Sequence, residues 1–496
     1  MSMQQLCAAT LPLLAKGVAR PSYDPAGVTL GVAHLGAGAF HRAHQALVTD
    51  RALVAGERGW GILAANLRAP TLRDALAPQD GLYALEESGA EGRRLRVIGA
   101  LRRFVVAQED PAALIEALAQ PQIRIVSLTI TEKGYCLDPA SGGLDEDHPD
   151  IRHDLANLHS PRSALGFISA ALQARRSAGV APFTLLSCDN LAANGQRLKR
   201  ALTRFAALIA ADFGHYVENE CACPATMVDR IAPALTPEDR TRINAALGLR
   251  DAAPVVAERF LQWIIEDDFP LGRPDWAAHG ATLVADAAPF EAMKLRLLNG
   301  AHSSLAWLGL LAGKETVAGA MADPAFARFA ARLMLEEAAP TLRPPPGAEM
   351  PDYVRALLAR FANPWLRHRL AQIAVDSSQK LPQRLLSTIR DRLHAGAPFP
   401  CLALAVAAFL RFSQGVDDAG RPLDLNDPLR DTLRRKGAAA GQDSAALTRE
   451  LLSIKTIFGN DLPADPRFVT AVSDALDALA RHGAAATLRR LAIAPP

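Results

Sequence analysis

Residues 31–40, GVAHLGAGAF, decide how the first half of the chain folds. The apolar run Gly31–Leu35 predicts a short buried strand, and the glycine-rich turn after it leads into a helix-compatible stretch from about His41 to Val54. Glycines permit a tight turn and close approach of a ligand to the backbone, and the N–H groups at a helix start attract phosphate. The turn therefore indicates a dinucleotide site, although a plain strand–turn–helix connection is the alternative because a histidine replaces the usual third glycine. The candidate cofactor residues are Gly36, Gly38, Phe40 and His41.

Further strand-like and helix-like segments alternate up to about residue 285. Apolar runs at 60–67, 124–130 and 183–188 predict buried strands, and residues 163–177 predict a helix between two of them. Repeated units of this kind indicate a parallel sheet with right-handed crossovers. The rest of the chain is rich in alanine and leucine, with helical periodicity. We therefore expect an α/β protein with a Rossmann-like domain over 1–285 and an all-helical substrate domain over 286–496.

Proline- and glycine-containing stretches punctuate the second half. Residues 344–347, 363–364 and 415–428 each predict a connection between helices.

The composition excludes several classes of protein. A net charge of +2 over 496 residues gives no reason to expect nucleic acid or an anionic membrane as a partner. The apolar run 401–410 is too short to span a bilayer, and the N-terminal stretch lacks the features of a signal peptide. Six scattered cysteines show no zinc-binding spacing, so we predict no metal site and reduced thiols in the cytoplasm. We expect a monomer or a small homo-oligomer that acts on a small molecule.

The second strand ends without the acidic residue that usually grips the ribose of NAD. Its end reads Asn66-Leu67-Arg68-Ala69-Pro70, and the first acid is Asp74. Arg68 is a candidate partner for the 2′-phosphate of NADP, or simply an exposed loop residue. The choice between NAD and NADP therefore stays open.

Polar residues follow several strands at their carboxyl ends, where open α/β sheets bind their ligands. Thr131-Glu132 follows the third predicted strand, Asp189-Asn190 follows the fourth, and Met227-Val228 leads into Asp229-Arg230. Asp and Asn are ordinary turn residues, but three such endings favour a common crevice.

A second candidate site lies in residues 290–307, FEAMKLRLLNGAHSSLAW. On an ideal α-helix, Glu291, Lys294, Asn299 and His302 fall within an arc of about 140°. A lysine, an amide, an imidazole and a carboxylate on a mostly apolar helix indicate an acid–base site, with an amphipathic surface helix as the alternative. Gly300 costs about 1 kcal/mol relative to alanine in mid-helix, so close approach of another backbone is a plausible reason for it.

Several long stretches resemble the mannitol dehydrogenase family of long-chain polyol and hexuronate dehydrogenases. They occur in order over nearly the whole chain: HLGAGAFHRAHQA (34–46), IVSLTITEKGYC (125–136), SCDNLAANG (187–195), MVDRIAP (227–233), GRPDW (272–276), MKLRLLNGAHSSLAWLG (293–309) and HRLAQIAVDSSQKLPQRLL (368–386). The resemblance implies a Rossmann-like domain, a helical C-terminal domain and metal-independent hydride transfer with a nicotinamide cofactor.

The resemblance also implies a role for each candidate residue. Lys294 would be the general acid–base, and Asn190 and Asn299 would hold the reacting oxygen. His302 and Asp229 would contact substrate hydroxyls. Glu132 and Glu291 would line the path of the proton.

This assignment agrees with the chemistry of alcohol oxidation, which needs a base on the hydroxyl as hydride leaves the carbon. Burial lowers the pKa of a lysine, which lets it accept that proton near neutral pH. Two amide donors on the same oxygen would act as an oxyanion clamp.

The last matching stretch, 368–386, is most similar to the fructuronate reductase branch. Gln372 stands where mannitol-type members have arginine. A hexuronate carboxylate needs a cation, which Arg369, Lys380 or Arg384 could supply. The expected reaction interconverts D-mannonate and D-fructuronate; a dehydrogenase for mannitol or arabinitol and a non-catalytic NAD-binding protein are the alternatives.

Overall fold

The computed structural model describes residues 3–89, 91–138, 141–366, 368–441 and 443–493. The chain divides into two compact units, residues 1–288 and 289–496. Each unit is described below by itself.

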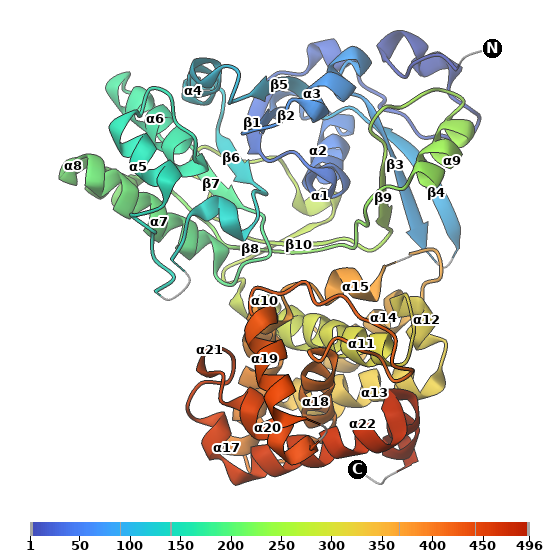
Figure 1. Ribbon diagram of the computed structural model, residues 1–496. Helices are drawn as coiled ribbons and strands as arrows, with labels where there is room; N and C mark the ends of the chain where they lie inside the picture. The colour runs from blue at the N-terminus through green and yellow to red at the C-terminus, as the bar shows by residue number, and fades with distance from the viewer. Residues whose placement is uncertain (1–2, 90, 139–140, 367, 442, 494–496) are drawn as a thin grey trace. The chain divides into compact units, whose positions relative to one another are not determined.

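A five-stranded parallel sheet forms the centre of the first unit. Its order is β5-β2-β1-β6-β7, from Leu101–Val106, Gly61–Asn66, Leu30–Leu35, Ile125–Leu128 and Thr184–Ser187. This corresponds to the first five strands of the Rossmann order 3-2-1-4-5-6, and the switch point lies between β1 and β6. The parallel sheet predicted from the sequence is confirmed, and Figure 1 shows its strands flanked by helices.

Both faces of this sheet are buried, as continuous apolar strands require. Leu35 and Val126 pack with side chains of α4 (Pro111–Ala119), α6 (Ala164–Ser177) and α7 (Asn194–Ile209). Val32 and Ile125 contribute to a second core that includes Leu47 of α2 (Gln45–Val54). The other helices of this unit are α1 (Ala39–Ala43), α3 (Thr71–Leu76), α5 (Pro149–Ala156), α8 (Ala211–Glu220) and α9 (Pro237–Leu247).

Two smaller sheets in the first unit were not predicted. One has the order β11-β10-β8, from Ala281–Val284, Gln262–Glu266 and Thr226–Asp229. The other has the order β4-β3-β9, from Gly92–Ile98, Tyr83–Gly89 and Val255–Glu258. Asp229 therefore ends a strand of a different sheet from β6 and β7, which Thr131 and Asp189 follow.

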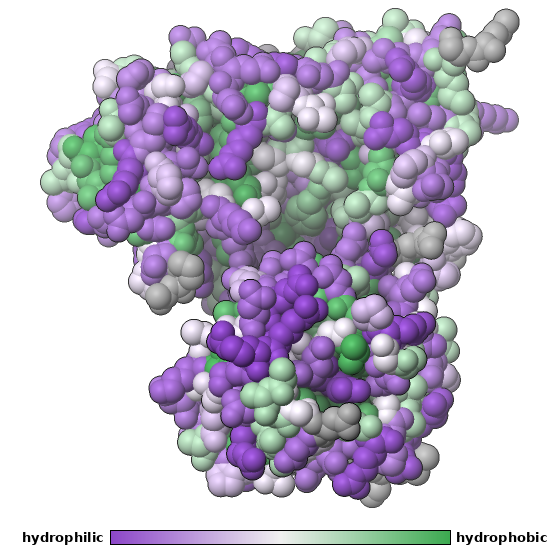
Figure 2. Space-filling model, viewed as in Figure 1, coloured by the Kyte–Doolittle hydropathy of each residue, from purple (hydrophilic) through white to green (hydrophobic). Residues whose placement is uncertain are grey.

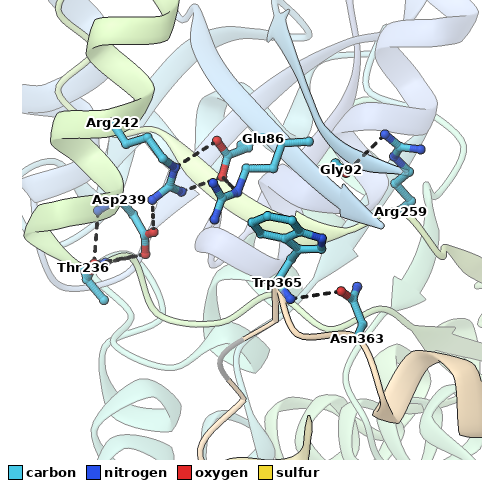
Figure 3. A network of polar contacts seen from close by, with 9 residues as sticks. Glu86, Gly92, Thr236, Asp239, Arg242, Arg259, Asn363 and Trp365 are labelled. Carbon is cyan, nitrogen blue, oxygen red and sulfur yellow. Dashed lines mark hydrogen bonds and ion pairs between the residues drawn. The ribbon is translucent and has the colours of Figure 1, made fainter. Parts of the chain in front are cut away.

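Charged side chains join α9 to the second of these sheets. Thr236 and Asp239 form a capping box at the start of α9. Arg242 donates to Asp239 at 2.6 Å and to Glu86 of β3 at 2.6 Å (Figure 3).

The helix predicted over 41–54 is interrupted. His44 has φ −122° and ψ −89°, so α1 ends at Ala43 and α2 begins at Gln45. The His44 ring lies 3.1 Å from the Gln262 carbonyl oxygen through Nε2. Contact with a strand distant in sequence thus accompanies a break that local periodicity does not signal.

Among its described residues, the second unit contains helices joined by loops and no β-strand. Residues 294–299 form a π-helix between α10 (Ala288–Met293) and α11 (Gly300–Leu311), and 333–338 and 382–386 form two more. The predicted inter-helix connections at 344–347, 363–364 and 415–428 all lie between helices. The helices are α10 (Ala288–Met293), α11 (Gly300–Leu311), α12 (Val317–Met321), α13 (Pro324–Arg332), α14 (Met350–Phe361), α15 (Leu370–Ile373), α16 (Ser377–Leu381), α17 (Ser387–His394), α18 (Pro400–Phe412), α19 (Arg430–Ala440), α20 (Ser444–Leu452), α21 (Lys455–Phe458) and α22 (Pro466–Ile493).

The apolar helix α18 is the core of this unit. It packs against α11 and α22, and Trp307 of α11 lies 5.3 Å from Phe409 between ring centroids. Over the ranges that the structure describes, no helix has the length and apolarity to cross a bilayer. The face in Figure 2 is mostly hydrophilic, with small hydrophobic patches.

One buried amide links two sheets of the first unit. The Asn194 side chain donates to the carbonyl oxygens of Ser187 (3.2 Å), Asp189 (3.1 Å) and Thr226 (2.9 Å), and accepts from the Thr226 N–H at 3.0 Å. Ser187 ends β7 and Thr226 begins β8. Asn194 therefore fixes Asp189-Asn190 relative to the strand that carries Asp229.

We expect Asn194→Ala to lower the free energy of unfolding by about 2–3 kcal/mol, because it leaves buried backbone groups without partners. Urea denaturation followed by circular dichroism measures this change. The control Asn219→Ala removes an exposed amide that bonds only within α8, and its effect is expected to stay below about 0.5 kcal/mol. Equal effects of the two substitutions would contradict the linking role of Asn194.

Candidate active site

The glycine turn connects β1 to α1 and contacts Thr129, just after the end of β6, at the switch point of the sheet. Gly36 has φ +87°, and a Cβ there would lie 2.3 Å from the Thr129 carbonyl oxygen. Gly38 caps α1, is exposed, and would place a Cβ no closer than 3.8 Å to its surroundings. Gly36 is thus required by the fold, whereas Gly38 keeps open the space in front of the first N–H groups of α1. This cradle fits a phosphate group.

Two buried histidines, His34 and His41, lie next to the glycine turn. The His34 ring lies 2.8 Å from both Ser127 Oγ and Thr129 Oγ1, and Thr129 Oγ1 donates to the Gly36 carbonyl oxygen at 2.8 Å. Burial lowers the pKa of His34 to about 3. His41 is fully buried and stacks on His34, with ring centroids 3.4 Å apart, and burial holds its pKa well below the usual range. The His41 side chain therefore packs beneath the turn.

Two other candidate cofactor residues, Phe40 after the turn and Arg68 after β2, are less buried than the histidines. Phe40 is half-buried and stacks on His44 at 5.1 Å between ring centroids. The side chain of Arg68, which follows β2, is 82% exposed and lies 3.4 Å from Asp150. An exposed guanidinium at this strand end remains accessible to a ligand.

Asp189 ties the loop after β6 to the end of β7. Its carboxylate accepts from the N–H groups of Ile130 (3.0 Å) and Thr131 (2.9 Å) and from the Tyr135 hydroxyl (2.7 Å). Burial raises the pKa of Asp189. Thr131 has φ +64°, so these bonds hold a backbone conformation that β-branched residues rarely adopt. Asp189 thereby brings together the loop that carries Glu132 and the strand end that carries Asn190, both of which are exposed.

Asp229 and Arg230 at the end of β8 are both buried. Arg230 bonds to Ala43 O at the end of α1, to Glu258 O through Nε at 2.8 Å, and to Glu87 at 2.6 Å. Arg230 therefore holds the end of β8 against α1, next to Asp229 in sequence.

The candidate acid–base residues of the second unit lie along a π-helix. Lys294 begins it and Asn299 ends it, and His302 follows on α11. Their exposed fractions are only 8%, 7% and 6%, whereas Glu291 is half-buried. Residues 294–299 form a π-helix, which has more residues per turn than an α-helix, so the arc of about 140° calculated for an ideal α-helix does not describe this segment. π-Bulges in helices occur frequently at functional sites.

The close approach expected at Gly300 is confirmed. A Cβ on Gly300 would lie 3.0 Å from the Arg384 carbonyl oxygen. The segment 368–386 thus packs directly against the segment 290–307.

The sequence did not indicate what surrounds His302. Its ring stacks on Phe361 at 4.7 Å and meets His368 edge-on at 4.9 Å between centroids. Burial, then the nearby His368, Arg384 and Arg360, hold the pKa of His302 well below its usual value. His302 Nε2 is buried with no hydrogen-bond partner among the described residues. His368 stood in a matching segment, whereas Arg360 and Phe361 lie on α14, where nothing in the local pattern distinguishes them.

The three candidate cations for a substrate carboxylate, Arg369, Lys380 and Arg384, have different surroundings. Arg384 donates to Ser303 Oγ at 3.0 Å, beside His302 in sequence. Lys380 donates to the carbonyl oxygens of Ile373 (3.3 Å) and Val375. Arg369 is exposed at the start of α15. Among the described residues, no three His, Cys, Asp or Glu side chains converge as metal ligands.

Comparisons with known proteins cover both units. The family model of the mannitol dehydrogenase Rossmann domain matches residues 30–278, and that of the mannitol dehydrogenase C-terminal domain matches residues 286–480. A protein of Escherichia coli named D-mannonate oxidoreductase is 45% identical, over 94% of this chain and 96% of its own. The mannitol 2-dehydrogenase of Aspergillus terreus is 38% identical over 94% of each chain.

Two solved structures have the same fold over their whole length. The mannitol 2-dehydrogenase of Pseudomonas fluorescens, in a ternary complex with NAD and D-mannitol, superposes with a TM-score of 0.90 at 39% identity, covering 99% of this chain and 100% of that chain. A substrate-free D-sorbitol dehydrogenase gives 0.89 at 30% identity, covering 98% and 100%.

The two glycines of the turn are expected to respond differently to alanine. Gly36→Ala should destabilise the protein, because its Cβ would clash with Thr129 O. Gly38→Ala should leave the thermal midpoint within about 2 °C and still weaken NADH or NADPH binding by about ten-fold, because its methyl enters the phosphate cradle. Fluorescence titration and thermal unfolding test both statements. Unchanged coenzyme affinity in Gly38→Ala would place the cofactor elsewhere.

Proposed function

Because the chain belongs to the mannitol dehydrogenase family, we propose that it interconverts a secondary alcohol and a ketone on an acyclic sugar acid, with D-mannonate and D-fructuronate as substrates. The observation that carries this choice is the cationic, buried surroundings of His302. We further propose that the reaction takes place in the cytoplasm, in keeping with six free cysteines.

We propose NAD as the coenzyme, since the turn at Gly36 and Gly38 suits a dinucleotide and the Pseudomonas relative holds NAD. When bound, the nicotinamide supplies or accepts the hydride. Arg68 leaves NADP as the alternative, because no acid stands at the end of β2 to repel a 2′-phosphate.

Lys294 is the proposed general acid–base. The Lys294 side chain is buried, and an amine sheltered from water can exchange a proton with a substrate hydroxyl as a general acid–base. Asn190 and Asn299 would donate to the reacting oxygen, each worth about 10²–10³ in rate if it acts as an oxyanion donor. Glu132 and Glu291 would pass the proton onward.

His302 is proposed to bind a substrate hydroxyl. A buried nitrogen with no partner among the described residues is costly, and a hydroxyl group would satisfy it. The ring stays neutral because it is buried near cations, so it can donate through one nitrogen and accept through the other. Asp229 is the second proposed hydroxyl contact.

Arg384 is the proposed partner of the substrate carboxylate. Its guanidinium bonds to Ser303, the neighbour of His302, and Arg360 adds positive potential at the same ring. A neutral polyol gains nothing from this potential, whereas a carboxylate gains charge-assisted bonds. Lys380 is less suited because its ammonium already bonds to two carbonyl oxygens, and exposed Arg369 is a weaker candidate.

We expect Lys294→Ala to lower kcat by about 10²–10⁴, the usual contribution of general acid–base catalysis, with coenzyme affinity unchanged. Stopped-flow turnover and NADH titration measure the two quantities. Lys455→Ala is the control, because Lys455 is an exposed lysine of the same unit. Full turnover of Lys294→Ala would show that another group is the acid–base, whereas a wild-type protein that binds NADH but turns over no substrate would favour the non-catalytic, NAD-binding alternative.

We expect Arg384→Gln to raise KM for D-mannonate by about ten-fold or more and to change mannitol kinetics little, because only the acid carries a carboxylate. Steady-state assays with both substrates and both coenzymes provide the test. Arg355→Gln is the control, since Arg355 is 77% exposed. If the wild-type protein oxidises mannitol or arabinitol far faster than D-mannonate, it is a polyol dehydrogenase instead.

A further inference from the structure

The first unit contains a cavity of about 610 Å³ that the proposed reaction does not use. Three arginines from separate segments line it: Arg20 near the N-terminus, Arg51 of α2 and Arg96 of β4. His279 and Gly280, which precede β11, close another side, and Asp50 lies among them.

This cavity is separate from the glycine turn. Arg51 lies in the last turn of α2, whereas the glycine turn and α1 precede the first residue of that helix. A ligand in the cavity would thus occupy the other end of α2.

Neighbouring groups hold the three guanidinium groups in place. Arg20 donates through Nη1 to Leu11 O at 3.2 Å, and Arg51 donates through Nη1 to His279 O at 3.0 Å. Arg96 Nε lies 3.0 Å from Glu87, which also bonds to Arg230. A guanidinium has five N–H donors, so these contacts orient each side chain without using its full capacity.

Gly280 keeps the wall beside Arg51 open. It has φ +117°, and a Cβ there would lie 3.2 Å from Arg51 Nη1. A side chain at this position would crowd the guanidinium from the cavity side.

We propose that this cavity binds a small dianion, the phosphate group of either free phosphate or a phosphate ester. Converging guanidinium groups on pre-positioned side chains recognise tetrahedral oxyanions through charge-assisted, paired hydrogen bonds. The site lies at the end of α2, the helix that follows the glycine turn and α1.

Asp50 makes this binding depend on pH. Its Oδ1 accepts from the Tyr23 hydroxyl at 2.6 Å and from the Gly99 N–H at 2.9 Å, and burial raises its pKa to about 6. Above that pH the carboxylate opposes an anion, and below it the neutral acid does not, so binding tightens as pH falls. The other charged or titratable groups around Asp50 and the cavity are Arg20, Tyr23, Arg51, Tyr83, Glu87, Arg96, Arg102, Arg230 and His279.

Calorimetric titration of the full-length protein with sulfate, at constant ionic strength set by chloride, tests the proposal. We expect saturable binding to the wild-type protein and about ten-fold weaker binding to Arg20→Gln and to Arg51→Gln. Ala55→Glu adds a negative charge at an exposed lining position without removing a contact of an arginine, and it should weaken binding similarly. This variant keeps the test valid if Arg51→Gln folds poorly.

Arg152→Gln is the matched control, because Arg152 is a 70% exposed arginine of the same unit outside the cavity. The proposal is overturned if wild-type protein shows no saturable binding of sulfate, or if the three cavity variants bind sulfate as well as Arg152→Gln does.

Two further titrations refine the assignment. Sulfate stays dianionic between pH 5 and 7.5, so the tighter binding expected at pH 5 tests Asp50 directly. A smaller pH dependence in Asp50→Asn than in the wild-type protein supports the role of Asp50. An identical pH dependence in both proteins overturns that role. Inorganic phosphate and glycerol 3-phosphate, compared at pH 7.5, distinguish a free ion from an ester by which of them binds more tightly.

Discussion

The first unit depends on the absence of a side chain at Gly36. Its α-carbon faces the Thr129 carbonyl oxygen so closely that even a methyl group would clash, and its φ of +87° disfavours other residues. This contact joins β1 to the end of β6 at the switch point, where an open α/β sheet binds its ligand. The hydrogen bonds of His34 and Thr129 then support the same turn from beneath.

Buried polar groups extend this arrangement to the other strand ends. Asp189 fixes the loop after β6, Asn194 fixes β7 against β8, and Arg230 fixes β8 against α1. Each acts mainly through backbone groups of a different segment. In this oxidoreductase of the mannitol dehydrogenase family, side chains that make no proposed contact with substrate therefore position the residues that do.

Sequence reasoning recovered the parts of this design that are local or repetitive. The glycine turn after β1, the parallel strands and the helical second unit follow from periodicity and turn chemistry. It missed the two small sheets: the pairing of β3 with β9 joins strands far apart in the chain, whereas the antiparallel pairing of β3 with β4 is local and was overlooked. It also missed the break at His44 and the π-helix at Lys294, which an ideal helix cannot represent. Arg360 and Phe361 reach His302 only through helix packing, so no local pattern identifies them.

The stacked imidazoles of His34 and His41 set a limit on acid tolerance. The folded protein binds a proton on His34 only near pH 3, whereas an unfolded chain does so near pH 6.5. Between these pH values His34 binds a proton in the unfolded state but not in the native state, so acidification favours unfolding. The stacked histidines next to the glycine turn therefore contribute less to the stability of the native state as the pH falls from about 6.5 towards 3.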